Sequence, residues 1–256
     1  MEPYIGITDF MSFEQVQKML TVFAKHLPAD SNQKLHVGVM MSYKTLHNIP
    51  TKWQTAFPDK KTIASIFSSD QVYNCLHYVD YDDESDLWKS LDLAISYYGG
   101  IWIHSLQLDM IWPDPGQIAN GLHTSRKQVE VILQIGKNAL AESNDDPQEV
   151  VRRIGDYEGV IQRVLLDKSM GRGIGLDAQE LLPFIRLIRK IFPDLGISVA
   201  GGLGPKSIHL LEPLLKEFPD LSFDAQGQLR PSGNALDPID WDLAGEYLVK
   251  ALQLVD

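Results

Sequence analysis

A glycine-rich segment in the last quarter of the chain has the composition of a phosphate-binding loop. The segment 200–207 reads AGGLGPKS and lies between an apolar run and an amphipathic stretch. Glycines allow backbone N–H groups to approach an anion closely, and the N-terminus of a following helix favours negative charge. A second segment, 224–227 (DAQG), can supply further N–H donors. Tight turns without a ligand are the alternative to the phosphate site that we predict at Gly201, Gly202, Leu203, Gln226 and Gly227.

Three aspartates are candidates for acid–base chemistry. Asp9, Asp109 and Asp167 each stand directly after an apolar run of the sequence. Carboxyl groups that face each other across a cavity can act as acid and base when their surroundings separate their pKa values. We expect Asp167 and Asp109 to form such a pair. For Asp167 the alternative is a loop cap or an ion pair with Lys168 or Arg172, and for Asp109 it is a carboxylate bonded to neighbouring strand-end groups.

Cations near the same positions are candidates for binding a substrate carboxylate or a second phosphate. Lys44 follows the apolar run 35–41, and Lys168 and Arg172 lie in the glycine-rich segment 167–175. A glycine-rich loop with two cations can close over a ligand as a lid. The alternatives are solvated side chains and an ion pair of either loop cation with Asp167.

The histidines and the single cysteine give no metal-binding pattern. The seven histidines contain no HxxxH or HxH pair. Cys75 is the only cysteine, so neither an intrachain disulfide nor a cysteine-based zinc cluster can form. We therefore predict that the protein uses no metal and no cofactor.

The chain is acidic, with a formal net charge of -11 from 34 acidic and 23 basic residues. Its average surface repels polyanions, which argues against a nucleic-acid partner and means that a phosphate needs a local site. No stretch reaches the about 18 apolar residues of a membrane helix, and the N-terminus carries no basic region. These features favour a cytoplasmic protein, monomeric or homodimeric, whose partner is a small phosphorylated molecule.

Short apolar runs alternate with amphipathic stretches along the chain, which is typical of βαβ units around a parallel sheet. We expect strands at 4–8, 35–41, 73–78, 102–108, 128–135, 160–166, 197–200 and 221–224. Helices are predicted at 13–26, 86–98, 148–157, 178–192, 207–218 and 238–254, with a shorter one within 113–122. The 256 residues match the roughly 250 of a (β/α)8 barrel. We therefore predict a single α/β domain over 1–256 with the TIM-barrel fold, whose site lies at the C-terminal ends of the strands.

Five short motifs, in this order and at matching strand positions, resemble phosphoribosylanthranilate isomerase. They are IGIT at 5–8, LQL at 106–108, LLD at 165–167, AGGL at 200–203 and DAQG at 224–227. The resemblance implies a metal-free Amadori rearrangement of a phosphoribosyl amine in a TIM barrel, with the phosphate bound after strands seven and eight. It places Asp167 on the family's general acid and Gly201, Gly202 and Gly227 on its phosphate loops.

The motifs depart from the family at positions that matter for catalysis. The resemblance implies a base cysteine directly before Gly-Ile-Thr, where this chain has Ile5, and a histidine after strand four, where it has Asp109. Asp109 or Asp9 is then the substitute base, and Lys44 is the nearest counterpart of the family's arginine after strand two. Three functions stay open: an isomerase-like enzyme of a phosphoribosyl or similar compound, a barrel that binds such a compound without catalysis, and a structural or interaction protein.

Overall fold

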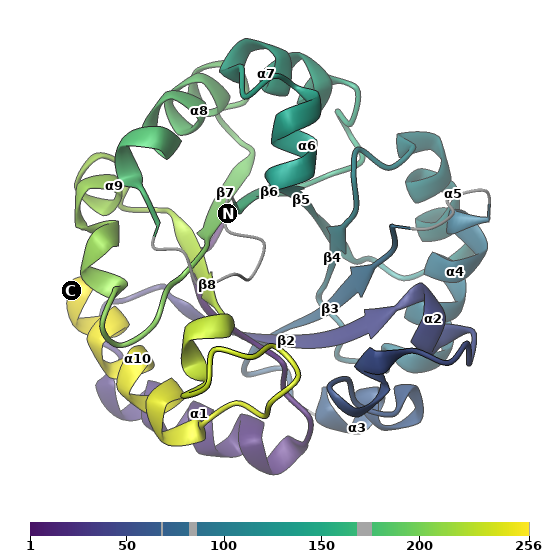
Figure 1. Ribbon diagram of the computed structural model, residues 1–256, viewed down its shortest axis with the longest axis horizontal. Coiled ribbons are helices and arrows are strands. Elements are labelled where there is room, and N and C mark those ends of the chain that lie inside the picture. Colours follow the sequence, from purple (N-terminus) through teal and green to yellow (C-terminus); the bar gives the residue numbers. More distant parts are fainter. Residues whose placement is uncertain (68, 82–85, 168–175, 256) are drawn as a thin grey trace.

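The computed structural model describes residues 1–67, 69–81, 86–167 and 176–255. Within these residues, parallel strands form a closed barrel in which each strand pairs with the next in sequence and the last pairs with the first (Figure 1). The strands are β1 (Tyr4–Thr8), β2 (Lys34–Ser42), β3 (Tyr73–Val79), β4 (Ser105–Asp109), β5 (Glu130–Gly136), β6 (Arg163–Asp167), β7 (Gly196–Ala200) and β8 (Ser222–Ala225). The predicted (β/α)8 barrel is confirmed.

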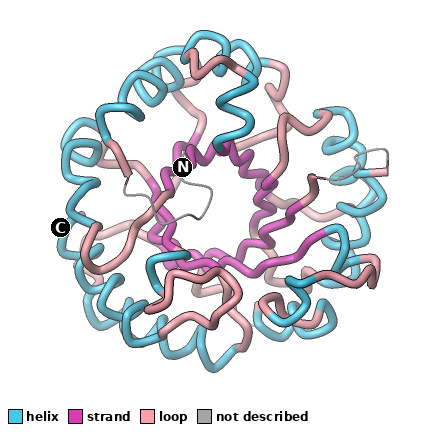
Figure 2. Tube along the Cα trace, in the orientation of Figure 1, coloured by secondary structure: helices cyan, strands magenta, loops and turns pink. Residues whose placement is uncertain are grey.

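Helices surround the barrel on its outer side (Figure 2). They are α1 (Phe13–His26), α2 (Tyr43–Leu46), α3 (Ile63–Ile66), α4 (Leu87–Leu93), α5 (Pro115–Ser125), α6 (Lys137–Glu142), α7 (Pro147–Gly155), α8 (Ala178–Ile191), α9 (Glu212–Glu217) and α10 (Trp241–Leu254). Short 3-10 turns occur at η1 (Lys52–Thr55), η2 (Lys60–Thr62), η4 (Ile208–Leu211) and η5 (Gly227–Leu229), and η3 (Ala94–Tyr98) is a π-helical turn. None of the helices in the described ranges is both long and apolar enough to cross a membrane.

Capping residues explain where several helices begin. The Ser12 hydroxyl accepts a hydrogen bond from the Gln15 backbone N–H, and the Gln15 side chain accepts one from the Ser12 N–H in return. Asp114 and Asp177 cap α5 and α8, and Pro115 occupies the first turn of α5. These local signals are visible in the sequence, so the predicted starts of these helices agree with the structure to within two residues.

Side chains alternate between two environments along each strand. On β1, Ile5 and Ile7 belong to the apolar cluster that joins the strands to the helices. Tyr4, Gly6 and Thr8 face the barrel interior, where Gly6 and Thr8 contact the inward side chain of β8. The interior also holds buried histidine, glutamine, arginine and serine side chains. Barrels of this kind usually fill their interior with branched apolar residues, so this interior is unusually polar.

Some predicted boundaries differ from the structure for local reasons. β4 begins three residues later than predicted because the Asn74 side chain donates to the Trp102 carbonyl, and the Asn74 N–H donates to His104 Nδ1. The predicted helix 207–218 begins as the 3-10 turn η4. It becomes α-helical only at α9, whose first turn contains Pro213, a residue that cannot donate to an earlier turn. The sequence pattern also does not predict the short helix α6.

Candidate active site

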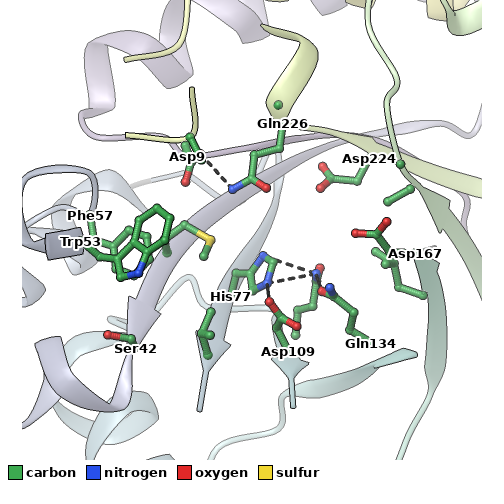
Figure 3. Close-up of a pocket in the computed structure, with 18 of the residues that line it drawn as sticks. Asp9, Ser42, Trp53, Phe57, His77, Asp109, Gln134, Asp167, Asp224 and Gln226 are labelled. Carbon is green, nitrogen blue, oxygen red and sulfur yellow. Dashed lines mark hydrogen bonds and ion pairs between the residues drawn. The ribbon is translucent and has the colours of Figure 1, made fainter. Parts of the chain in front are cut away.

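A cavity of about 350 Å³ opens inside the barrel at the C-terminal ends of the strands (Figure 3). Every strand, or the loop directly after it, contributes to its lining. Predicted site residues that line the cavity are Asp9, Asp109, Asp167, Gly201, Gly202, Leu203, Gln226 and Gly227. Lys44 lies in α2 and is not among the described lining residues, whereas Lys168 and Arg172 lie outside the described part of the chain.

Asp9 follows β1 and forms a buried ion pair. Its carboxylate accepts hydrogen bonds from the Arg230 guanidinium and, at 2.9 Å, from the Gln226 amide. The Asp9 backbone has a positive φ of 86°, and its N–H and that of Phe10 both donate to the Gly38 carbonyl. A carboxylate held in this way is poorly placed to take a proton from a ligand.

Asp224 occupies the inward face of β8 and has a very different environment. Its Oδ2 accepts a hydrogen bond of 2.8 Å from the Thr8 hydroxyl, while its Oδ1 has no hydrogen-bond partner among the described residues. Burial raises the pKa of Asp224 to about 7, because the charged form loses its contact with water. The sequence prediction placed this residue at the end of strand eight and at the start of the segment 224–227, but gave it no catalytic role. Its inward position on a strand was the signal that could have identified it.

Asp167 is the last residue of β6 and is mostly buried. Its carboxylate and that of Asp224 both point into the cavity in Figure 3. After burial, the negative charges of Asp9 and then of Asp167 raise the pKa of Asp224. Asp167 therefore lies close enough for its charge to influence the protonation of Asp224.

His77 and Asp109 form a second polar group on the floor of the cavity. His77 Nε2 lies 3.7 Å from Asp109 Oδ2, and the Tyr81 hydroxyl donates to the other oxygen of the same carboxylate. Gln107 Nε2 contacts the His77 ring at 3.3 Å and donates to Gln134 Oε1 at 2.8 Å. The structure thus places Asp109 in the cavity, as predicted, but already engaged with His77 and Tyr81. The sequence prediction missed His77, because the spacing of the histidines shows no pattern.

The glycine loops after β7 and β8 form one side of the cavity. Gly201 and Gly202 have positive φ values of 119° and 63°, which other residues adopt only with strain. The Ser207 hydroxyl donates to the Gly202 carbonyl at 2.6 Å and holds the first loop in place. No hydrogen bond between described residues uses the N–H of Gly202 or Gly227 as its donor. A helix dipole contributes less than predicted, since only the 3-10 turn η4 follows.

Two aromatic side chains form the opposite side. Trp53 lies in η1 and Phe57 just after it, and their rings are nearly parallel with centroids 6.0 Å apart. Both belong to the long connection between β2 and β3 (Figure 3). Neither residue stands at a strand end, so the sequence pattern did not indicate a role in the site. Nothing in an isolated aromatic residue of a long connection distinguishes a cavity wall from core packing.

The structure does not support the strand-one match to phosphoribosylanthranilate isomerase. Ile5, which occupies the position of the family's base, is fully buried in the apolar cluster between the barrel and the helices. A side chain at this position points away from the cavity, whatever its chemistry. The described residues also contain no group of three or more His, Cys, Asp or Glu side chains arranged to hold a metal ion.

The fold and the polar strand ends define the chain as a (β/α)8 barrel with an acid-rich cavity at its mouth. No family model matches the sequence, and no curated protein matches it either. Among solved structures, a similar one is the sulfate complex of octameric ribulose-1,5-bisphosphate carboxylase/oxygenase from Pyrococcus horikoshii OT3. It has a TM-score of 0.54 and 10% sequence identity, over 100% of this chain and 58% of that one. The chain thus spans somewhat over half of that protein's length, and the likeness is one of fold alone.

Proposed function

We propose that the barrel binds a phosphorylated small molecule and isomerises it by acid–base catalysis with Asp167 and Asp224. The observation that carries the proposal is that Asp224, with its pKa raised to about 7, shares the cavity with Asp167 and with the glycine loops. A carboxyl group with such a pKa is present in both its acid and its base form at neutral pH. It can therefore remove a proton from one atom of a ligand and return it to another.

The phosphate of the ligand is proposed to lie at Gly201, Gly202, Leu203, Gln226 and Gly227. Loops after strands seven and eight are the common phosphate site of this fold. Leu203 would contribute through its backbone, since its side chain is buried in the outer apolar cluster. The rest of the ligand, such as a ribosyl group with a substituent, would extend toward Trp53 and Phe57.

The four aspartates of the lining do not exclude an anionic ligand. The charge of Asp9 is balanced by Arg230, and Asp109 accepts a hydrogen bond from the Tyr81 hydroxyl. The raised pKa of Asp224 leaves a large fraction of its carboxyl groups uncharged at neutral pH. The cavity is therefore less negative than the number of carboxyl groups suggests.

The proposed reaction needs only proton transfers. One carboxylate removes a proton from a carbon next to a carbonyl or imine carbon, and the carboxylic acid donates a proton to the oxygen or nitrogen of that group. The reverse transfers at the neighbouring atoms complete the isomerisation and restore both carboxyl groups. No oxidant, reductant or second substrate takes part.

A barrel that binds a phosphorylated compound without catalysis is the second candidate. It is favoured by the internal hydrogen bonds of Asp9 and Asp109, which reduce the number of carboxylates available to a ligand. The variants Asp167→Asn and Asp224→Asn separate the two candidates. For an enzyme we expect both to bind ligand and to lose turnover, and turnover retained in both contradicts the proposed mechanism.

Binding is tested by a thermal-shift screen of ribose 5-phosphate, other sugar phosphates and phosphoribosyl compounds, because a specific ligand raises the apparent stability. Gly202→Ala should remove the shift. Gly233→Ala is the matched control, since Gly233 has a similar φ of 68°, no atom within 4 Å of its added Cβ, and no place in the cavity lining. Both variants should lose about 1 kcal/mol to backbone strain, but only the control should keep the ligand shift. Absence of a shift with every compound contradicts both candidate functions.

A further inference from the structure

His36 lies directly beneath Asp224 in the barrel interior and has no assigned role. The residue is on the inward face of β2 and is fully buried. Its Nδ1 lies 3.9 Å from Asp224 Oδ1. Both ring nitrogens and this carboxyl oxygen lack a hydrogen-bond partner among the described residues. Buried polar atoms are rarely left without partners, so this arrangement calls for a physical reason.

The position of the His36 ring is fixed by its neighbours. Tyr4 stacks on it with ring centroids 4.4 Å apart and an angle of 17° between the planes, and Tyr73 contacts it at 5.8 Å. The guanidinium of Arg163 lies over the Tyr4 ring at 4.9 Å and donates to the Ser222 hydroxyl at 2.6 Å. The imidazole is therefore held with one edge toward Asp224.

Glycine at position 6 makes this approach possible. A Cβ atom on Gly6 would lie 2.4 Å from Asp224 Oδ1 and 3.0 Å from His36 Nδ1. Any other residue would push the carboxyl group and the imidazole out of their present places. The sequence thus keeps a free space beside the two groups, between β8 and β2.

We propose that His36 is a positioning residue for Asp224, which donates a hydrogen bond to Oδ1 when the carboxyl group is ionised and accepts one when it is protonated. The proposal rests on the proposed role of Asp224 in proton transfer. A neutral imidazole has one donor and one acceptor nitrogen and can exchange them by changing tautomer. The two atoms must approach from 3.9 Å to about 3 Å, the length of a hydrogen bond.

The surroundings keep His36 neutral, as this role requires. Burial, followed by the charges of His77 and Arg163, lowers the pKa of His36 to about 3. Thr8 cannot replace the imidazole, because its hydroxyl already donates to the other carboxyl oxygen. Other titratable or charged groups that act on Asp224 or His36 from the neighbouring elements are Tyr4, Asp9, Cys75, His77, Arg163, Asp167 and Tyr247.

The proposal is tested by NMR on the complete chain without any ligand. In a pH titration, the 15N resonances of the His36 ring should shift with the same midpoint as the 13C carboxyl resonance of Asp224. The direction of the 15N shifts should indicate that the neutral ring changes tautomer and is not protonated to imidazolium. Asp224→Asn should abolish this movement and identify the carboxyl resonance. Ring resonances of His36 that do not respond to the ionisation of Asp224 would overturn the proposal.

Two substitutions give an independent measurement. His36→Phe keeps a stacked ring but removes both nitrogens, and should raise the titration midpoint of Asp224 by about one pH unit or more. His36→Gln offers one donor and one acceptor group, so the titration midpoint of Asp224 in this variant should lie between those of the wild-type protein and His36→Phe. His123→Phe, on the exposed part of α5, is the control and should leave the midpoint unchanged. An unchanged midpoint in His36→Phe contradicts the proposal, and since no ligand is used, its failure is separate from that of the proposed function.

Discussion

Asp9 directly follows β1, Asp224 lies on the neighbouring strand β8, and both line the same cavity, yet they differ in their electrostatic surroundings. Asp9 is paired with the buried guanidinium of Arg230 and with the Gln226 amide. Asp224 has only the Thr8 hydroxyl as a hydrogen-bond partner among the described residues, and its pKa is raised to about 7. Position at a strand end alone therefore does not determine what a carboxylate can do. Its hydrogen-bond and ion-pair partners determine whether it is held as a structural ion pair or can exchange a proton.

Removing the partner of Asp9 should have the largest effect. Arg230→Met leaves a buried carboxylate without its counter-ion, which should lower the free energy of unfolding by about 3–5 kcal/mol. Urea unfolding at pH 7 measures this change. Arg189→Met breaks the more exposed pair with Asp220 and should cost less than about 1 kcal/mol. An equal loss of unfolding free energy in the two variants would show that burial does not make the Asp9–Arg230 pair more important for stability than an exposed pair.

Asp224→Asn removes a buried charge, and its effect on the free energy of unfolding should have the opposite sign to that of Arg230→Met and should depend on pH. The pKa of Asp224 is raised on folding from 3.8 to about 7, so the stability that it contributes is complete below its unfolded pKa and is lost as pH rises toward 7. Relative to Asp224→Asn, the wild-type protein should lose about 2–3 kcal/mol of unfolding free energy between pH 5 and pH 8. Urea unfolding of both proteins at pH 5, 6.5 and 8 measures the difference. A difference that does not change with pH would contradict the raised pKa.

The smallest effect is expected at Thr8, the hydrogen-bond partner of Asp224. Thr8→Val keeps the shape of the side chain but removes the hydroxyl that donates to Oδ2. Because a hydrogen bond to a charged group stabilises the ionised form, its loss should destabilise the protein by about 1–2 kcal/mol more at pH 8 than at pH 5. Thr21→Val, on the exposed face of α1, serves as the control without such a pH dependence. A pH-independent loss at Thr8 would mean that its hydroxyl does not support the charge of Asp224.

The sequence predicted the barrel because its alternation of apolar runs and amphipathic helices is a local pattern, repeated along the chain. The sequence also predicted that Asp109, Asp167 and the loop glycines lie at one site, because the strand ends of such a barrel meet at one mouth. These residues line the cavity in the structure. The sequence could not predict that Arg230 would neutralise Asp9, because the two residues are 221 positions apart. The role of His36 was equally hidden. It depends on which face of β2 the side chain occupies and on the missing side chain at Gly6.

The closure of the barrel between β1 and β8 has a consequence for the order of folding. The hydrogen bonds from Thr8 to Asp224, and from Gln226 and Arg230 to Asp9, join residues 216, 217 and 221 positions apart. Contacts between such distant parts of a chain form slowly. His77 and Asp109 come from β3 and β4, so their contact does not require β8. The environments of Asp9 and Asp224 both require β8 or the segment after it. The candidate site is therefore complete only once β8 has docked against β1.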